Sequence, residues 1–280
     1  PYLTSDYRNM VERAEMILTG TEIVMRAVGV SRAVIGVENN KPDAIEHLRN
    51  IIRRDNYRGI EVMPLKTRYP QGGEKQLIAA VTGRQVPPPP ALPISVGAVV
   101  CNVSTAIAVY EAVQKNKPLI ERVVTITGKE LGSTHNFMVR FGTSLDYLLS
   151  LSGGLPEGDG KVLNGGPMMG RAVSNLESTT SKRTSGLLIM PDYLSKRAPI
   201  ENCIRCGKCV DACPMALEPY LLHSLTEHSM WNRLEQDQIM DCIECGCCLF
   251  SCPSHRPLLD YVRLGKATVG GIIRARNAKK

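Results

Sequence analysis

Residues 203–214 are CIRCGKCVDACP, and residues 242–253 repeat the same cysteine spacing as CIECGCCLFSCP. This spacing, C-x2-C-x2-C-x3-C-P, is typical of bacterial ferredoxins. There the first three thiolates of a run bind one iron-sulfur cube, and the fourth reaches the cube of the other run. The repeat therefore predicts two 4Fe-4S clusters.

The predicted ligand sets cross between the two runs. The first set is Cys203, Cys206, Cys209 and Cys252, and the second set is Cys242, Cys245, Cys248 and Cys213. On this assignment neither run completes a cluster without the other. Cys247 lies between two ligands of the second set, and we expect it to pack beside the cluster.

Structural zinc and disulfide bonds are the alternative uses of these cysteines. Zinc usually joins two C-x2-C pairs across roughly fifteen to twenty residues and needs only four sulfurs, a pattern that triplets of cysteine do not fit. Disulfides are typical of secreted chains, and the sequence shows no hydrophobic signal segment. Both alternatives are therefore disfavoured.

Length and composition bound what surrounds these motifs. The 280 residues leave room for one or two further domains, and a hydrophobic fraction of 43% with 22% charged residues is ordinary for a globular protein. The longest apolar stretch, residues 91–103, contains Pro93 and is shorter than the roughly twenty residues of a membrane-spanning helix. We therefore expect no membrane span.

Most of the net charge of +7 lies at the C-terminal end. Residues 261–280 contain no acid and carry the basic residues Arg263, Lys266, Arg274, Arg276, Lys279 and Lys280. Such a tail could meet anionic lipid or an acidic electron carrier, although basic tails are more often solvated and mobile. With 5% aromatic residues and no basic stripe elsewhere, nucleic acid is excluded as a partner.

Hydrophobic periodicity predicts alternating helices and strands in the first third of the chain. The expected helices are Asp6–Val28, Pro42–Arg54, one from the glycines near residue 72 to about Val81, and Ser104–Val113; the expected strands are Ala33–Val37, Gly59–Met63 and Val96–Val100. This alternation implies a parallel α/β sheet.

Beyond Glu121 the pattern changes to short strands separated by glycines, which predicts a small mixed α+β domain. The expected elements are strands at Val123–Thr127, Phe137–Phe141 and Gly165–Gly170, a helix at Ser144–Leu151 and a loop at Ser174–Ser185. Between the cysteine runs, a helix from Tyr220 to about Met230 favours a helix-rich ferredoxin module.

A flavin cradle is a further expectation from the chemistry. A hydride carries two electrons and a cube carries one, so a redox enzyme that uses both needs a flavin. Gly72-Gly73-Glu74 could bring backbone amides to a phosphate or an isoalloxazine edge at a helix N-terminus. Alternatively, it is an ordinary glycine turn, and Asn102 is an ordinary helix cap. Neither segment matches the G-x-G-x-x-G fingerprint.

Nearly the whole chain resembles the C subunit of the Rnf (Rsx) ion-translocating electron transport complex. The resemblance is carried by PYLTSDYR at residues 1–8, GVENNKP at 36–42, YPQGGEKQL at 69–77, NVST at 102–105, NGGPMMG at 164–170 and the two cysteine runs. That protein is in turn similar to the NADH-binding flavoprotein subunit of respiratory Complex I.

This resemblance implies the fold class. It is an α/β Rossmann-like flavoprotein domain, partial here, followed by a small α+β domain of the SLBB β-grasp type and a helix-rich two-cluster ferredoxin domain. The corresponding ranges are 1–116, 117–192 and 193–262, with a basic tail at 263–280. The family's preceding glycine-rich loop is absent, so we expect the chain to be truncated at its N-terminus.

The resemblance also implies cofactors and partners. FMN contacts carry over to Gly72, Gly73, Glu74, Lys75, Asn102 and Thr105. The implied function is electron transfer between NAD(H), FMN and two 4Fe-4S clusters in a peripheral subunit on the cytoplasmic face of the cell membrane. Its partners would be NAD(H), ferredoxin or a ferredoxin-like subunit, and the other subunits of a complex that moves Na⁺ or H⁺.

Two other functions stay open from the sequence. A soluble flavin and iron-sulfur cobalamin reductase is similar to this family in domain order. A non-catalytic relay, in which only the clusters work and the upstream domains serve as docking surfaces, is the alternative from another class.

Overall fold

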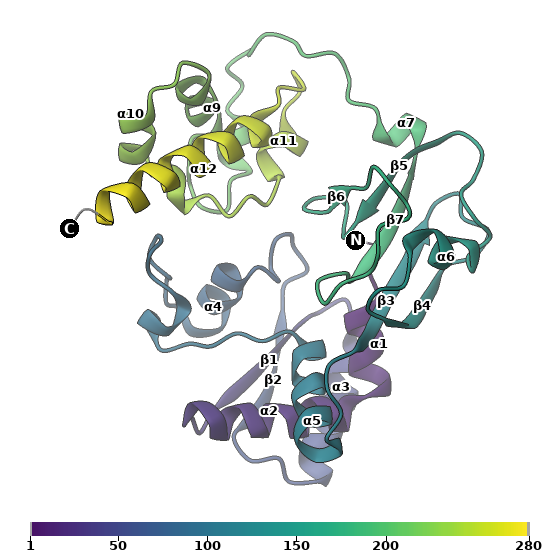
Figure 1. The fold of residues 1–280 in the computed structure, drawn as a ribbon. Helices are drawn as coiled ribbons and strands as arrows, with labels where there is room; N and C mark the ends of the chain where they lie inside the picture. Colours follow the sequence, from purple (N-terminus) through teal and green to yellow (C-terminus); the bar gives the residue numbers. More distant parts are fainter. Residues whose placement is uncertain (1, 279–280) are drawn as a thin grey trace. The chain divides into compact units, whose positions relative to one another are not determined.

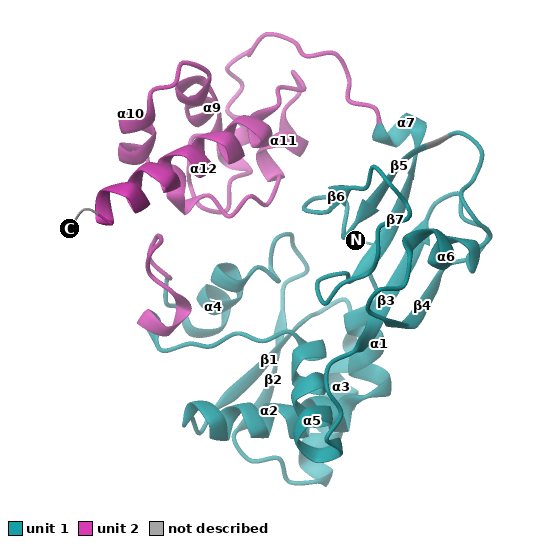
Figure 2. Ribbon diagram, viewed as in Figure 1, with its two compact units in different colours: residues 1–85, 96–195 teal, residues 86–95, 196–280 magenta. Residues whose placement is uncertain are grey.

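The computed structural model describes residues 2–278, which form two compact units (Figure 2). The first unit runs through Gln85 and continues from Val96 to Ser195, and the second contains Val86–Ser95 and the chain from Lys196 onward. Buried hydrophobic residues form two clusters in unit 1 and a separate one in unit 2, so each unit has its own core.

The first part of unit 1 is a mixed α/β layer (Figure 1). Its helices are α1 (Ser5–Glu12), α2 (Ala14–Val28), α3 (Pro42–Arg54), α4 (Glu74–Thr82) and α5 (Val103–Lys115), and its strands are β1 (Ala33–Glu38) and β2 (Ile60–Leu65). β1 and β2 pair in parallel, with Ala33 opposite Ile60. The predicted parallel pairing of these two strands is confirmed.

The helix expected from Asp6 to Val28 is in fact two helices. Arg13 lies between them with φ −133°, outside the helical region, so the chain turns there between α1 and α2. Gly29 ends α2 in the left-handed conformation with φ 70°, which glycine adopts without a steric penalty. The predicted end of the helix is right, and the break inside it was missed.

The strand predicted at Val96–Val100 is wrong. Residues 93–96 form the short 3₁₀ helix η1 (Pro93–Val96), and residues 98–102 have no regular structure. Gly97 takes φ 70°, which bends the chain where an extended segment was expected. The helix that follows begins where it was predicted, after Asn102.

The core of this layer includes residues of α2 and α3. Ile17, Leu18 and Leu48 are at most 1% exposed, and they contact residues of β1, β2 and α5 in one hydrophobic cluster. Gly20 allows α2 to approach α5 closely, since a Cβ at this position would lie 1.9 Å from the carbonyl oxygen of Ala106. The contact is therefore made between the two backbones.

The second part of unit 1 is a five-stranded mixed sheet with one helix across it (Figure 1). Its elements are β3 (Glu121–Gly128), β4 (His135–Arg140), α6 (Leu145–Ser150), β5 (Asp159–Asn164), β6 (Arg171–Ala172), β7 (Gly186–Pro191) and the short α7 (Asp192–Ser195). The strand order is β4-β3-β7-β5-β6, with β3 and β7 parallel in the middle. Leucines of α6 pack against the apolar face of β3 and β7.

Within this sheet one predicted strand is wrong. Residues 165–170 form a turn between β5 and β6, because Gly165 has φ 111° and the N–H of Gly170 donates to the carbonyl of Gly166 at 2.8 Å. Strand β7, which lies in the centre of the sheet, was not predicted. The helix capped by Ser144 and the loop after Ser174 are confirmed.

Unit 2 is helical. Its helices are α8 (Lys208–Asp211), α9 (Pro219–Glu227), α10 (Trp231–Gln236), the 3₁₀ turn η2 (Ile239–Asp241), α11 (Cys247–Ser251) and α12 (Leu258–Asn277). Leu222, Leu234 and Ile239 are at most 1% exposed and form the centre of its core. The expected helix between the cysteine runs is present as α9.

The expectation of a mobile basic tail is wrong as far as Asn277. Residues 258–277 form one helix, in which Val262 and Val269 are 2% and 1% exposed and pack into the core of unit 2. The basic residues lie on a helix that has a buried face. Among the described helices, none is both long and apolar enough to span a membrane.

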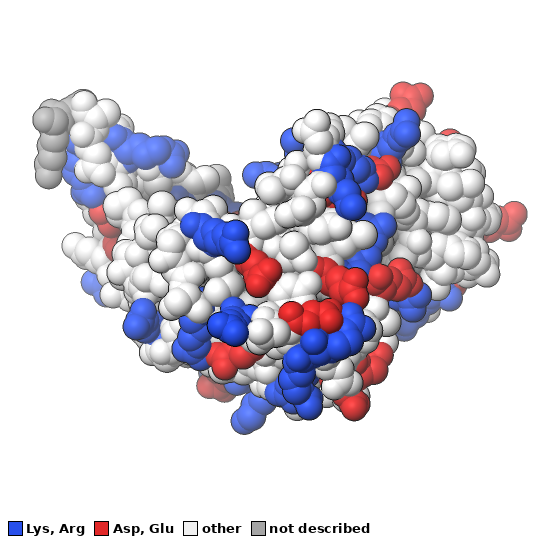
Figure 3. Space-filling model, turned by 90° about the horizontal axis from the view of Figure 1, so that it is seen from below, with Lys and Arg blue, Asp and Glu red and all other residues white. Residues whose placement is uncertain are grey.

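Charges of both signs share the surface. On the face that Figure 3 presents, Lys and Arg side chains alternate with Asp and Glu side chains. The ion pairs include Arg54 with Glu15 at 2.7 Å and Lys117 with Glu121 at 2.8 Å. That face therefore presents no field of a single sign.

Replacing Gly20 by alanine should destabilise unit 1. The new methyl group would meet the Ala106 carbonyl, and overpacking of this kind costs about 1–3 kcal/mol. We expect a lower midpoint in thermal unfolding followed by far-ultraviolet circular dichroism. Gly132→Ala is the matched control, because the nearest atom there is 3.8 Å away. Equal midpoints for the two variants would contradict the packing described for α2 and α5.

Candidate iron-sulfur and flavin sites

The two cysteine runs fold into the same backbone shape. Arg205 and Glu244, the third residues of the runs, have φ 56° and 55°, and the glycines two positions later, Gly207 and Gly246, have φ 77° and 85°. Each glycine caps a short helix, α8 or α11. Left-handed residues at matching positions curl each run into a loop of the same shape.

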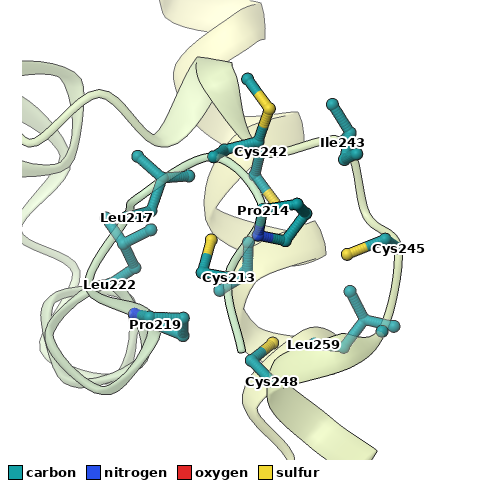
Figure 4. Close-up of a pocket in the computed structure, with 13 residues that line it drawn as sticks. Cys213, Pro214, Leu217, Pro219, Leu222, Cys242, Ile243, Cys245, Cys248 and Leu259 are labelled. Atoms are coloured by element: carbon teal, nitrogen blue, oxygen red, sulfur yellow. The ribbon is translucent and has the colours of Figure 1, made fainter. Parts of the chain in front are cut away.

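One cavity in unit 2 brings together cysteines from both runs. Figure 4 shows the sulfur atoms of Cys213, Cys242, Cys245 and Cys248 around one space. The rest of the wall is mainly apolar and comes from Leu217, Pro219, Leu222, Leu259 and Val262. Cys213 belongs to the first run and the other three cysteines to the second. The donor set and the low polarity of the wall suit an iron-sulfur cluster.

The remaining cysteines lie together less tightly. The thiols of Cys209 and Cys252 are close enough for a charge on one to affect the other, and so are Cys203 and the hydroxyl of Tyr220. Cys203 and Cys206 are exposed. Across residues 2–278, no three His, Cys, Asp or Glu side chains are grouped as the ligands of a single metal ion would be.

Three thiols in or beside this cavity, those of Cys242, Cys247 and Cys248, have a raised pKa. Burial raises the pKa of Cys248 to about 12, with neighbouring thiols adding to the effect, and burial also raises the pKa of Cys242. Cys247 has a pKa raised to about 12 by burial and by its hydrogen bond with Cys245. Because metal ligands must be thiolates, loading this cavity with iron has to release protons.

The loop of the second run is anchored to α12. Glu244 forms ion pairs with Arg263 at 3.2 Å and with Lys266 at 3.3 Å. The ammonium group of Lys266 also donates to the carbonyl oxygen of Cys242 at 2.5 Å. Gly265 lets α12 lie close to α9, since a Cβ there would be 2.4 Å from the hydroxyl of Thr226. Helix α12 therefore fixes the loop that carries three cavity cysteines.

The glycine segment suggested for the flavin lies at the N-terminus of α4. Gly73 is the cap residue with φ −65°, and its N–H donates to the carbonyl of Pro70 at 2.8 Å. A Cβ at Gly72 would meet nothing within 4 Å. No steric contact within the protein requires glycine at position 72, so the open space there is available to a ligand. Glu74 is exposed at the start of the helix.

Asn102 is a helix cap, which was one of the two interpretations that the sequence allowed. Its side-chain oxygen accepts from the N–H of Ser104 at 2.8 Å, and its amide nitrogen donates to Asp6 at 2.8 Å. Thr105 is exposed in the first turn of α5. The cap leaves both residues at the surface of a groove with a volume of about 150 Å³.

This groove contains a residue that sequence reasoning missed. Arg122 of β3 lines it, and the buried Nε of Arg122 has no hydrogen-bond partner in the described structure. Arg13 and Lys182 line the same groove, which also holds Glu111 and Glu121 paired with Lys117. The signal in the sequence was an arginine directly before the apolar residues Val123 and Val124 of a strand. The groove includes Asn102 and Thr105 but none of residues 72–75.

Comparison with protein-family models identifies two segments. Residues 1–111 match the Nuo51 FMN-binding domain, and residues 196–253 match the 4Fe-4S dicluster domain. The cysteine runs and the anchored loop fall inside the second match. Order and identity of the two domains agree with the coarse fold class expected from the sequence.

Curated relatives extend the match to almost the whole chain. The C subunit of the proton-translocating ferredoxin:NAD(+) oxidoreductase complex of Clostridium ljungdahlii is 42% identical over 95% of this chain and 58% of its own length. The C subunit of the Na(+)-translocating ferredoxin:NAD(+) oxidoreductase complex of Acetobacterium woodii is 43% identical over 96% of this chain and 60% of its own length.

The chain is a homologue of these C subunits. It spans about 60% of the length of the relatives. Among solved structures, the NAD+-reducing [NiFe]-hydrogenase in the H2-reduced state matches with a TM-score of 0.61 and 16% identity, over 95% of this chain and 54% of that chain. At this identity the likeness concerns the fold alone.

Lys266→Met should loosen the second cysteine loop. The variant keeps most of the apolar stem but loses the hydrogen bond to the Cys242 carbonyl and the ion pair with Glu244, a loss of about 1–2 kcal/mol. The free energy of unfolding is measured by urea unfolding of the anaerobically purified protein, followed by the fluorescence of Trp231 in α10. Lys115→Met, on α5 of unit 1, should leave this transition unchanged.

Proposed function

We propose that this chain is the flavin and iron-sulfur part of the C subunit of an ion-translocating ferredoxin:NAD oxidoreductase. The observation that carries the proposal is an identity of 42–43% with two such proteins over at least 95% of the chain, including both cysteine runs. Its substrates would be NAD(H) and, through partner subunits, ferredoxin. The membrane subunits would move Na⁺ or H⁺, and this chain would be peripheral on the cytoplasmic face.

The proposed ligands are those expected from the sequence. Cys213 joins Cys242, Cys245 and Cys248 in one set, supported by the cavity that these four side chains share. Cys252 joins Cys203, Cys206 and Cys209 in the other, supported by the proximity of the Cys209 and Cys252 thiols. The thiolates would hold the clusters, and the leucines of the cavity wall would keep water from the second set.

For the flavin, the proposed residues are Gly72, Gly73, Glu74, Lys75, Asn102 and Thr105. The space beside Gly72 and the N-terminus of α4 support a cofactor with an anionic group there. Arg122 adds a cation in the groove beside Asn102 and Thr105. These residues would hold FMN, which would supply the chemistry that links a two-electron hydride to one-electron carriers.

The proposed domains are residues 1–116 for FMN and NADH, 117–192 for an SLBB β-grasp domain and 193–262 for the clusters, with the basic C-terminal segment at 263–280. A β-grasp sheet has its first and last strands parallel in the middle and a helix across one face. The order β4-β3-β7-β5-β6 with α6 packed on β3 and β7 supports that assignment.

The decisive experiment is assembly and turnover. The full-length protein, co-expressed with the integral membrane subunits of its complex, should copurify with them, contain FMN, and reduce NAD⁺ with reduced ferredoxin. Copurification without flavin would leave only the relay function. Corrinoid-dependent NADH oxidation by protein free of membrane subunits would replace the proposal by cobalamin reduction.

Cys213→Ser should remove one cluster. About half of the iron and acid-labile sulfide should be lost, because the cavity lined by Cys242, Cys245 and Cys248 loses its fourth thiolate. Iron analysis and electron paramagnetic resonance of anaerobically prepared protein measure the loss. Cys247→Ser is the control and should keep both clusters. Loss of the cluster held by Cys203, Cys206 and Cys209 alone would refute the crossed assignment.

Gly72→Val should weaken FMN binding without affecting the fold. The added side chain meets no protein atom within 4 Å at its Cβ, but it occupies the space in front of the α4 amides. We expect at least a tenfold higher Kd for FMN, measured by flavin fluorescence on the full-length protein. Gly132→Val serves as the matched control in the same unit. A Kd within twofold of the parent would place the flavin elsewhere.

A further inference from the structure

The two cysteine loops share a backbone but differ in charge. Residues 203–209 carry Arg205 and Lys208, whereas residues 242–248 carry Glu244 and no basic residue. Arg205 and Glu244 occupy the same position of the loop, with φ 56° and 55°. Because the fold of the loop is the same in both, the difference in charge does not arise from the demands of the backbone.

Internal contacts compensate only one of these charges. Glu244 pairs with Arg263 and Lys266 of α12, and Cys245 beside it is 7% exposed. Arg205 and Lys208 make no ion pair or side-chain hydrogen bond to any other residue between 2 and 278. All of residues 201–208 are exposed. The second loop is part of the interior of unit 2, and the first is a surface.

Exposed apolar side chains flank the first cysteine set. Ile204 lies between Cys203 and Cys206 and is 67% exposed. Phe250 lies on α11 two residues before Cys252 and is 82% exposed. Helix α11 packs against α8, which begins inside the first loop. Uncompensated cations next to large exposed apolar groups are the composition of a protein-binding surface, with a hydrophobic anchor and a charged margin.

We propose that the loop of residues 203–209, together with Phe250, is the docking surface for an acidic electron-carrier protein. The inference rests on the proposed function, which places a cluster behind this loop. Two unpaired cations select a carrier with acidic side chains around its own redox centre, and such complementarity accelerates encounter. Ile204 and Phe250 bury apolar area once contact is made, which lengthens the lifetime of the complex.

The surface lies where a bound carrier could exchange electrons with the first cluster. A carrier bound here would face Cys203 and Cys206, the exposed thiols of the first set, so that no other protein layer separates the two redox centres. The loop of residues 242–248 offers no equivalent surface, because α12 holds Glu244 and Cys245 is buried. The first set is therefore the place where electrons enter or leave unit 2, and the second set is internal.

The test measures binding as well as electron transfer. The probe is an acidic two-cluster ferredoxin, added to the anaerobically reconstituted protein and its variants at low and high salt. In the parent, the Kd should rise steeply with ionic strength. In Arg205→Glu/Lys208→Glu, we expect at least a tenfold higher Kd at low salt and a much weaker salt dependence. A matched pair elsewhere, Arg58→Glu/Lys129→Glu, makes the same change in net charge and should stay within twofold of the parent.

Phe250→Ser tests the apolar part of the surface. It should raise the Kd at both salt concentrations and increase the dissociation rate, since an anchor acts after encounter. In Phe250→Ser, the rate of electron transfer with ferredoxin, measured by stopped flow, should fall in parallel. In Arg205→Glu/Lys208→Glu, the rate of electron transfer to a basic partner, cytochrome c, should not fall. Iron and sulfide content of all variants should match the parent. The midpoint potential of the first cluster should fall in the charge-reversed variant, because added negative charge beside a cluster disfavours its reduction, so the docking surface is judged from Kd and its salt dependence.

The outcomes separate this inference from the proposed function. A parent protein without iron and sulfide would remove the proposed function. A parent with clusters, in which the 205/208 and 58/129 variants bind ferredoxin equally well, would overturn the docking surface alone. Loss of rate that follows a shifted midpoint potential, with unchanged Kd and salt dependence, would overturn it too. So would binding of the loop to anionic lipid vesicles in preference to ferredoxin.

Discussion

The structure of unit 2 depends on one constraint: cysteines separated by almost thirty residues must meet around one space. Cys213 ends the first run, and Cys242, Cys245 and Cys248 open the second, yet all four line a single cavity. Helix α9 and the turns around it occupy the intervening chain and bring the runs together. The hydrophobic core formed by α9, α10 and α12 thus supports the cavity, and Cys213 and Cys242 pack directly against this core.

In unit 1, the features proposed to bind the flavin lie at the N-terminal ends of helices. The N-terminus of α4 offers amides beside an empty space at Gly72, and the N-terminus of α5 is completed by its own cap, Asn102. Arg122 adds a charge from the neighbouring sheet. A cofactor in this unit would therefore be held mostly by main-chain groups and few side chains, which is why sequence motifs identify such a site poorly.

The sequence predicted those features that local chemistry controls. Helices α3 and α6, strands β1 and β2 and the Asn102 cap follow from periodicity and capping, and the cysteine spacing alone indicated the cluster motif. The break at Arg13 and the central strand β7 were missed. Strand β7 pairs with β3 and β5, which are distant in sequence, so its place in the sheet is decided by long-range contacts. Gly165–Gly170 was taken for a strand although its glycines form a turn.

The site residues divide in the same way. Cysteine positions could be named from spacing, and the resemblance to a known family supplied the flavin positions. Neither could reveal the anchoring of Glu244 by α12, the unpaired Nε of Arg122 or the exposure of Phe250, since these depend on which side chains the fold brings together and which it leaves without partners. Tertiary contacts, and not local pattern, distinguish the two cysteine loops.

The close approach at Gly20 has a consequence for precision. Two helices that touch through their main chains cannot slide along each other by a fraction of a turn without collision, because no flexible side chain lies between them to absorb the shift. The position of α5 along α2 is therefore constrained by the contact at Gly20. The positions of Asn102 and Thr105, at the start of α5, therefore depend on Gly20, which is distant in sequence and has no side chain.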